Sequence, residues 1–226
     1  MSDTTYHPAE RRPIATRDLE IVQRVAAWLI AQGVSANAVS VSSLAFAALA
    51  SLCLIETVST DVFGRRWLFI LAALFVQLRL LANLLDGMIA VGSGQSSRQG
   101  ELYNEAPDRA ADVLILIGAG FATGGTPALG YLAALAAVFV AYVRALGSSL
   151  GVRSLFIGPM AKPQRMGMIT AACVYCACAP GGWPGGLTAE EPGAVTVALT
   201  LIIAGAGLTA WRRLRRIAAE LRETAS

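Results

Sequence analysis

The chain has 226 residues, 55% of them hydrophobic and only 15% charged, with a formal net charge of +3. Soluble domains are about a quarter charged, so this composition, with a mean hydropathy of +0.58, excludes an ordinary soluble protein. It predicts an all-α integral membrane protein with one helical domain and gives no indication of nucleic-acid binding. The four cysteines are interpreted as small buried hydrophobic residues and not as a disulfide framework, although Cys173-x-x-Cys176 leaves a redox or metal site open.

Two segments precede the apolar part of the chain. Residues 1–16 form a polar tail without the apolar core of a secretory signal. From 17 to 32 apolar residues recur at intervals of three and four, which predicts an amphipathic helix lying in the membrane interface. A helix packed on the cytoplasmic face of the domain is the alternative. The apolar face consists of Leu19, Val22, Val25, Ala26, Leu29 and Ile30.

Six apolar segments follow and predict six transmembrane helices in a membrane domain over residues 38–211. Residues 212–226 form a basic tail, which we expect anionic lipid headgroups to hold. Arg79 lies inside the second span, where the sequence is compatible both with a buried partner for its charge and with a role facing phosphate. The expected spans are 38–55, 67–90, 104–124, 127–143, 166–179 and 194–211.

The residues that indicate a chemical function lie between Asn83 and Asp108. Asn83 and Asp86 are three residues apart and share one helix face, while Asn104 and Asp108 are four apart and share another. Two such faces brought together offer four oxygen-bearing side chains, which suits Mg²⁺. Asn104 has an alternative role as the N-cap of the third span. Pro107 would then lie in the first turn, where its missing N–H does no harm.

These residues resemble the motif of the CDP-alcohol phosphatidyltransferase family, D-x2-D-G-x2-A-R-x8-G-x3-D-x3-D. The spacing agrees at every position. The first and third Asp of the family are Asn83 and Asn104 here, and its Arg is Val91. The matching residues run Asn83-Leu-Leu-Asp86-Gly87-Met-Ile-Ala90-Val91, then eight residues, then Gly100-Glu-Leu-Tyr-Asn104-Glu-Ala-Pro-Asp108.

The resemblance implies a phosphatidyltransferase that moves a phosphatidyl group from a CDP-diacylglycerol-like lipid donor to a small alcohol and releases CMP. It implies Mg²⁺ or Mn²⁺ as the cofactor, Asp108 as the catalytic base, and membrane lipids and a second copy of the chain as partners. The metal ligands would be Asn83, Asp86, Asn104 and Asp108. The nucleotide would be bound by Asn37, Asp86, Gly87, Ala90 and Gly100.

The two amides open an alternative function. Asn keeps an acceptor oxygen but carries no charge, so metal affinity should fall. Glu105 and Asp112 are near enough in sequence to compensate in part. The alternative is a catalytically weakened relative that acts as a nucleotide-lipid-binding membrane interaction protein. A small transporter is disfavoured, because the acidic residues lie near a span end and not at the membrane midplane.

Two further elements also resemble the family. Ala36-Asn37-Ala38-Val39-Ser40 is similar to its Pro-Asn-x-x-Thr element near the nucleotide, although Asn37 could equally cap the first span. The segment from Gly158 to Arg165 is similar to its Gly-Lys-x-Lys-Thr element. Basic side chains here suit an acceptor phosphate or the donor pyrophosphate, and ordinary cytoplasmic positive charge is the alternative. The candidates are Arg144, Arg153, Lys162 and Arg165.

Charge sets the expected orientation. With six spans both termini share one side, and this side collects every Lys and Arg except Arg65, Arg66 and Arg79. Because positive residues concentrate on the cytoplasmic side, we expect both termini and the site at the cytoplasmic face of a bacterial-type inner membrane. A donor nucleotide would then reach the site from the cytosol.

Overall fold

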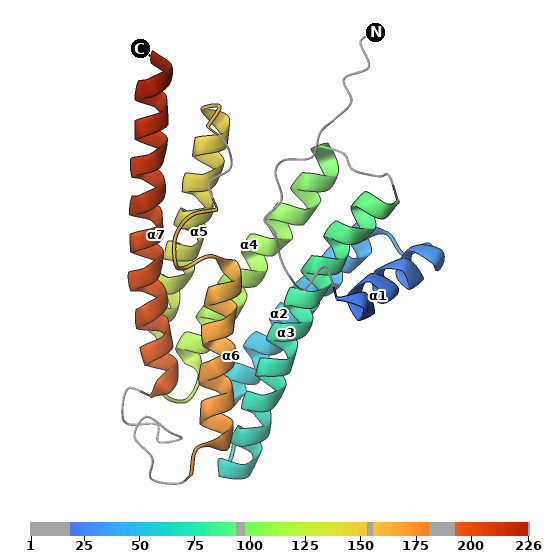
Figure 1. The fold of residues 1–226 in the computed structure, drawn as a ribbon. Helices are drawn as coiled ribbons and strands as arrows, with labels where there is room; N and C mark the ends of the chain where they lie inside the picture. The colour runs from blue at the N-terminus through green and yellow to red at the C-terminus, as the bar shows by residue number, and fades with distance from the viewer. Residues whose placement is uncertain (1–18, 94–97, 153–155, 181–192, 226) are drawn as a thin grey trace.

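Every secondary-structure element of the described chain is a helix (Figure 1). The computed structural model describes residues 19–93, 98–152, 156–180 and 193–225, and within helix α4 the side chains are described from 105 onward. The seven helices are α1 (Glu20–Ala31), α2 (Ala36–Glu56), α3 (Val62–Gly92), α4 (Arg98–Phe121), α5 (Pro127–Ser149), α6 (Lys162–Cys178) and α7 (Ala194–Ala225).

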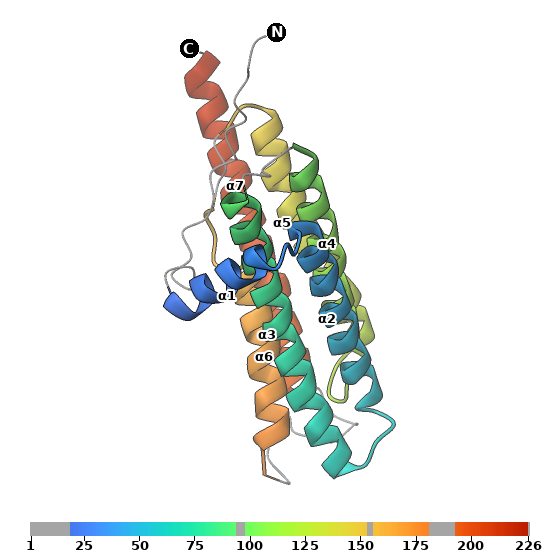
Figure 2. The same ribbon diagram turned by 90° about the vertical axis from the view of Figure 1, so that its right-hand side faces the viewer.

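Helices α2 to α7 run up and down in alternation, and α1 lies across them (Figures 1 and 2). The N-terminal ends of α2, α4 and α6 therefore meet the C-terminal ends of α3, α5 and α7 at one end of the bundle. Among the described residues, four helices are long and apolar enough to cross a membrane: α2, α3, α5 and α7. They include the predicted first, second, fourth and sixth spans. That α4 and α6 also cross the membrane stays a prediction.

Helix α1 falls within the predicted amphipathic segment 17–32. It buries Val22 and Ala26 in a small cluster with Leu84, Leu85 and Ile89 of α3. Its outer face remains exposed, and membrane lipid would suit these apolar side chains. That face carries Leu19, Ile21, Val25 and Trp28.

Two boundaries differ from the prediction. Helix α4 begins at Arg98, so Pro107 lies inside the helix and Asn104 is not its N-cap. The residues before Asn104 include Arg, Gln, Glu and Leu, which favour helix, and the helix continues despite the backbone hydrogen bond that Pro107 removes. Helix α7 continues to Ala225, so it extends beyond the predicted end of the sixth span at 211, and the interaction of the basic residues after 211 with lipid headgroups stays a prediction.

Small side chains let the helices approach closely. A Cβ on Gly130 of α5 would lie 2.8 Å from the Cα of Gly120 in α4, so neither position accommodates a side chain. Close backbone approach of this kind is how helices associate in a membrane, where apolar side chains alone give no preference for protein over lipid. The fully buried alanines of the core are Ala47, Ala50, Ala72, Ala111, Ala119 and Ala133.

Candidate active site

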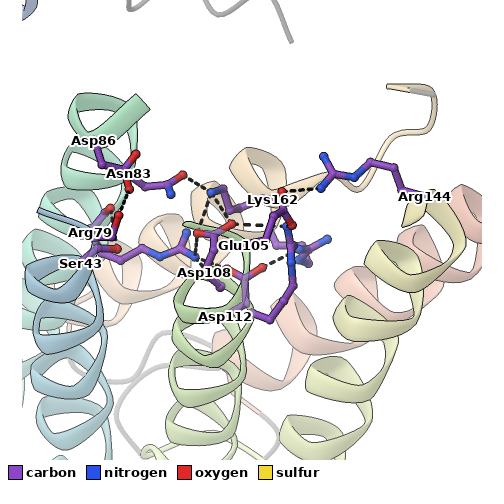
Figure 3. A network of polar contacts seen from close by, with 12 residues as sticks. Ser43, Arg79, Asn83, Asp86, Glu105, Asp108, Asp112, Arg144 and Lys162 are labelled. Atoms are coloured by element: carbon purple, nitrogen blue, oxygen red, sulfur yellow. Dashed lines mark hydrogen bonds and ion pairs between the residues drawn. The ribbon is translucent and has the colours of Figure 1, made fainter. Parts of the chain in front are cut away.

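Three helices bring their charged residues together at the end of the bundle where α3 ends and α4 and α6 begin (Figure 3). Side chains three and four residues apart share a helix face, so each helix presents its polar residues on one side and its apolar residues on the other. Helix α3 contributes Arg79, Asn83 and Asp86, α4 contributes Asp108 and Asp112, and α6 contributes Lys162 and Arg165.

Asp86 is a buried carboxylate with a single side-chain donor among the described residues. It is 2% exposed, and the hydroxyl of Ser40 on α2 donates to its Oδ2 at 2.7 Å. Its Oδ1 has no hydrogen-bond partner among the described residues. Sequence reasoning could have found Ser40, because it occupies the Thr position of the element near Asn37. An unsatisfied carboxylate oxygen is unfavourable inside a protein, which makes Asp86 a candidate for ligand binding.

Asp108 forms ion pairs with three cations, of which Arg109 is the most distant, at 3.5 Å from its Oδ2. The ammonium of Lys162 donates to its Oδ1 at 2.8 Å and its Oδ2 at 2.7 Å. Arg79 donates to Oδ1 at 2.7 Å and to the backbone carbonyl of Asp108 at 3.0 Å. Lys162 also donates to Oδ1 of Asn83. The structure thus joins Asn83, Asp108 and Lys162 from three helices.

Asp112 lies one turn below Asp108 and completes the buried network. Arg79 donates to its Oδ1 at 2.7 Å, and Arg165 donates to its Oδ2 at 2.6 Å. Arg79 is fully buried. Of the two roles that the sequence left open for Arg79, the structure favours the buried partner. Sequence reasoning singled out Asp112 as one turn beyond Asp108, but it gave no sign that two arginines converge there.

A second, more exposed group lies at the rim. The carboxylate of Glu105 accepts from Arg109 and from Arg144 on α5, each at 2.6 Å. Its side chain is 52% exposed. Arg109 was not among the predicted residues, although it stands one position after Asp108. Arg144, expected at a phosphate, is therefore paired with a carboxylate.

A cavity of about 530 Å³ opens beside this network, between α3, α4, α5, α6 and α7. Leu78, Leu81 and Val140 line its apolar part. Its polar part is rich in cations, which suits an anionic ligand. The polar lining consists of Asn83, Glu105, Asp108, Arg109, Arg144, Lys162, Arg165 and Arg213.

Of the remaining predicted residues, the structure describes the surroundings of some but not of others. Asn37 is exposed in the first turn of α2, and Ser35 caps that helix by accepting from the backbone N–H of Ala38 at 3.2 Å. The capping role considered for Asn37 is therefore wrong. Gly87 and Ala90 are half-buried near the end of α3. Gly100 and Asn104 lie in α4, where their side chains are outside the described part, and Arg153 lies outside the described residues altogether.

Asp86 and Asp108 differ in how well they could hold a divalent cation. No group of three His, Cys, Asp or Glu side chains among them is placed to hold a metal ion. Asp86 fits a cation, because its buried Oδ1 accepts no hydrogen bond from a described residue. Asp108 fits less well, because an ammonium and a guanidinium already occupy its carboxylate.

The fold is shared with solved enzyme structures. The chain matches phosphatidylinositol phosphate synthase (PgsA1) of Mycobacterium tuberculosis in complex with manganese and citrate, with a TM-score of 0.68 and 18% identity over 87% of this chain and 88% of that chain. The same enzyme with CDP-DAG bound matches with a TM-score of 0.67 and 18% identity over 88% of this chain and 94% of that chain. At this identity the likeness shows the fold.

One sequence relative is the inner membrane protein YnbA of Escherichia coli (strain K12), 28% identical over 139 residues. The match covers 61% of this chain and 66% of that protein. No family model matches the chain. The inner membrane relative and the four long apolar helices support an integral membrane protein.

Proposed function

We propose that the protein is a CDP-alcohol phosphatidyltransferase, which transfers a phosphatidyl group from a CDP-diacylglycerol-like donor to a small alcohol and releases CMP. The observation that carries the proposal is the unpartnered oxygen of Asp86, one helix turn from Asn83, which lines the cation-rich cavity together with Asp108. The fold around it is shared with a synthase crystallised with CDP-DAG. A buried acceptor oxygen and surrounding cations suit a nucleotide pyrophosphate and its counter-ion.

In this proposal the donor lies at the ends of α2 and α3. Asp86 holds the divalent cation, Mg²⁺ or Mn²⁺, with Asn83, Asn104 and Asp108 as the further candidate ligands. A bound cation would supply Lewis-acid stabilisation of the charge on the pyrophosphate. Gly87, Ala90, Gly100 and Asn37 would leave room for the nucleotide, because they carry little bulk or only an amide there.

The acceptor enters the cavity between α3 and α7. Its hydroxyl oxygen attacks the β-phosphorus of the donor, the bond from that phosphorus to the CMP oxygen breaks, and the hydroxyl proton passes to Asp108. Lys162 and Arg79 fix the carboxylate in place, which favours positioning of the base. The basic lining favours a phosphorylated acceptor, with Arg144, Arg153, Lys162 and Arg165 as the candidate phosphate ligands.

The membrane arrangement is part of the proposal. Helices α4 and α6 pack within the bundle of α2, α3, α5 and α7, and six crossings put the ends of α3 and α7 on the same side. Positive residues dominate that side. The site would then face the cytoplasm while the acyl chains of the donor remain in the bilayer, and α1 would lie in the interface.

Release of CMP tests the function directly. Purified protein in detergent is incubated with CDP-diacylglycerol, Mg²⁺ or Mn²⁺, and a panel of alcohols that includes glycerol 3-phosphate, inositol phosphate, serine and choline. Acceptor-dependent CMP release that is lost in Asp108→Asn is expected, because Asn keeps the shape of the side chain and removes the base. No release across the panel, with CDP-diacylglycerol still bound, would instead support the non-catalytic interaction protein.

A further inference from the structure

Lys162 is the only lysine among the 18 Lys and Arg residues of the chain. Its ammonium contacts three oxygen atoms from two helices, Oδ1 of Asn83 and both carboxylate oxygens of Asp108. Figure 3 shows Lys162 reaching toward both residues from the other side of the site. An ammonium is a compact point charge with three donors, whereas a guanidinium is a broad planar fork. A position between an amide and a carboxylate therefore suits lysine.

The buried carboxylates of the site differ in whether a cation is paired with them. The carboxylates Asp86, Asp108 and Asp112 are each 5% exposed or less. Asp108 and Asp112 pair with four cations, and each buried ion needs such a partner to offset its lost hydration. These cations are Arg79, Arg109, Lys162 and Arg165. A divalent ion at Asp108 would meet the ammonium of Lys162 at the same oxygen atoms, and the like charges would repel.

The two acidic positions differ in what they lack. Asp108 has cations on both carboxylate oxygens, while Asp86 has one hydroxyl donor and one oxygen without a described partner. Asp86 therefore forms no ion pair with a described residue, whereas Asp108 already has cationic partners on both oxygens. Asn83 fits this arrangement, because its amide oxygen accepts from Lys162 without adding a further negative charge.

We propose that the ammonium of Lys162 serves as a built-in cation between Asn83 and Asp108, and that the site binds one divalent cation, at Asp86. The inference rests on the proposed function for the role of that cation, but it concerns the number of ions and not turnover. It also assigns Lys162 a phosphate-facing charge that is present before any metal ion binds.

The test counts Mn²⁺ ions per chain by equilibrium dialysis on the full-length protein in detergent, without nucleotide. The wild type is expected to bind one ion. Asp86→Asn should weaken this binding by about tenfold or more, since it removes a direct ligand. Lys162→Met should bind a second ion, because it removes the ammonium from Asp108 and from Oδ1 of Asn83 and leaves Arg79 on Oδ1 of Asp108 only. Arg216→Met removes one positive charge from an exposed pair within α7 and should bind one ion, as the wild type does.

A second measurement needs no variant. Lys162 is the only side-chain amine, so its acylation by a small anhydride is read from one peptide by mass spectrometry. Saturating Mn²⁺ should leave the acylation rate unchanged, because the ion binds at Asp86 and leaves the ammonium in place. A severalfold change in that rate overturns the proposal, as do zero or two ions in the wild type, or a single ion in a folded Lys162→Met.

The two proposals can fail separately. One bound ion without CMP release would support the built-in cation and contradict the transferase. CMP release with two ions per chain would support the transferase and contradict the built-in cation.

Discussion

Asp86 and Asp108 are both buried, yet their surroundings are opposite. Asp86 is 2% exposed and Asp108 is 5% exposed. One oxygen of Asp86 accepts from Ser40 and the other has no described partner, whereas both oxygens of Asp108 contact Lys162. A buried carboxylate without a cation is unfavourable, so we expect a bound ligand to supply the missing partner of Asp86. At Asp108 the fold supplies the partners itself.

The comparison separates stability from ligand binding. The network of Asp108 and Asp112 joins α3, α4 and α6 through short ion pairs, so its loss should affect folding first. The pair of Ser40 and Asp86 joins only α2 and α3 by one hydrogen bond, so its loss should affect function first. The following variants break or sharpen this division.

Asp112→Ala should have the largest effect on stability. It leaves Arg79 and Arg165 as buried charges with one partner fewer each, and breaking a buried pair in this way costs about 3–5 kcal/mol. The free energy of unfolding is measured by SDS titration in mixed micelles. Glu220→Ala is the control, since it breaks the exposed pair with Arg216 and should cost about 0.5 kcal/mol or less. Equal losses in the two variants would contradict a stabilising role for the network.

Asp86→Asn should reduce activity strongly and stability little, the opposite of the network variant. The amide keeps an acceptor for Ser40, so the free energy of unfolding should change by about 1 kcal/mol or less. Acceptor-dependent CMP release should fall by about 100-fold or more, which corresponds to ~2.7 kcal/mol of lost transition-state stabilisation. The same preparation serves for both measurements. A stable variant with full activity would remove Asp86 from the site.

The helices and the motif could be predicted from sequence because both depend on local spacing. The apolar periods of α2, α3, α5 and α7 are long and continuous, and Asn83 and Asp86 share a face by helix geometry alone. The start of α4 was placed too late because Pro107 was taken as a first-turn residue. Its internal position depends on packing that a local pattern does not contain.

The cations of the site could not be predicted, because their partners are distant in sequence. Lys162 meets Asp108 across α6 and α4, and Arg165 meets Asp112 in the same way. A long side chain reaches any of several neighbours, and only the packed helices select one. The sequence therefore indicates that basic residues gather here but not that they neutralise Asp108 and spare Asp86.

Ser40→Ala should have a moderate effect, and it tests whether the hydrogen bond to Asp86 contributes to donor binding. A hydrogen bond to a carboxylate is worth about 1.5–3 kcal/mol, so KM for CDP-diacylglycerol should rise about tenfold while the acceptor KM stays unchanged. Ser43→Ala is a matched control on the same helix. Ser43 is also buried, but it contacts only the backbone carbonyl of Arg79, at 3.5 Å. A similar rise in both variants would point to packing of α2 instead of the bond to Asp86.

Glu105→Gln should have the smallest effect and tests the rim of the cavity. The variant frees Arg109 and Arg144 from a carboxylate that is 52% exposed, so the gain is limited by solvent screening. KM for glycerol 3-phosphate should fall about two- to fivefold, the range of an exposed ion pair, while KM for glycerol stays the same. Raising the ionic strength should reduce the difference, since the Debye length shortens to ~3 Å at 1 M salt. An equal change for both acceptors would mean that Glu105 shapes the cavity without opposing phosphate.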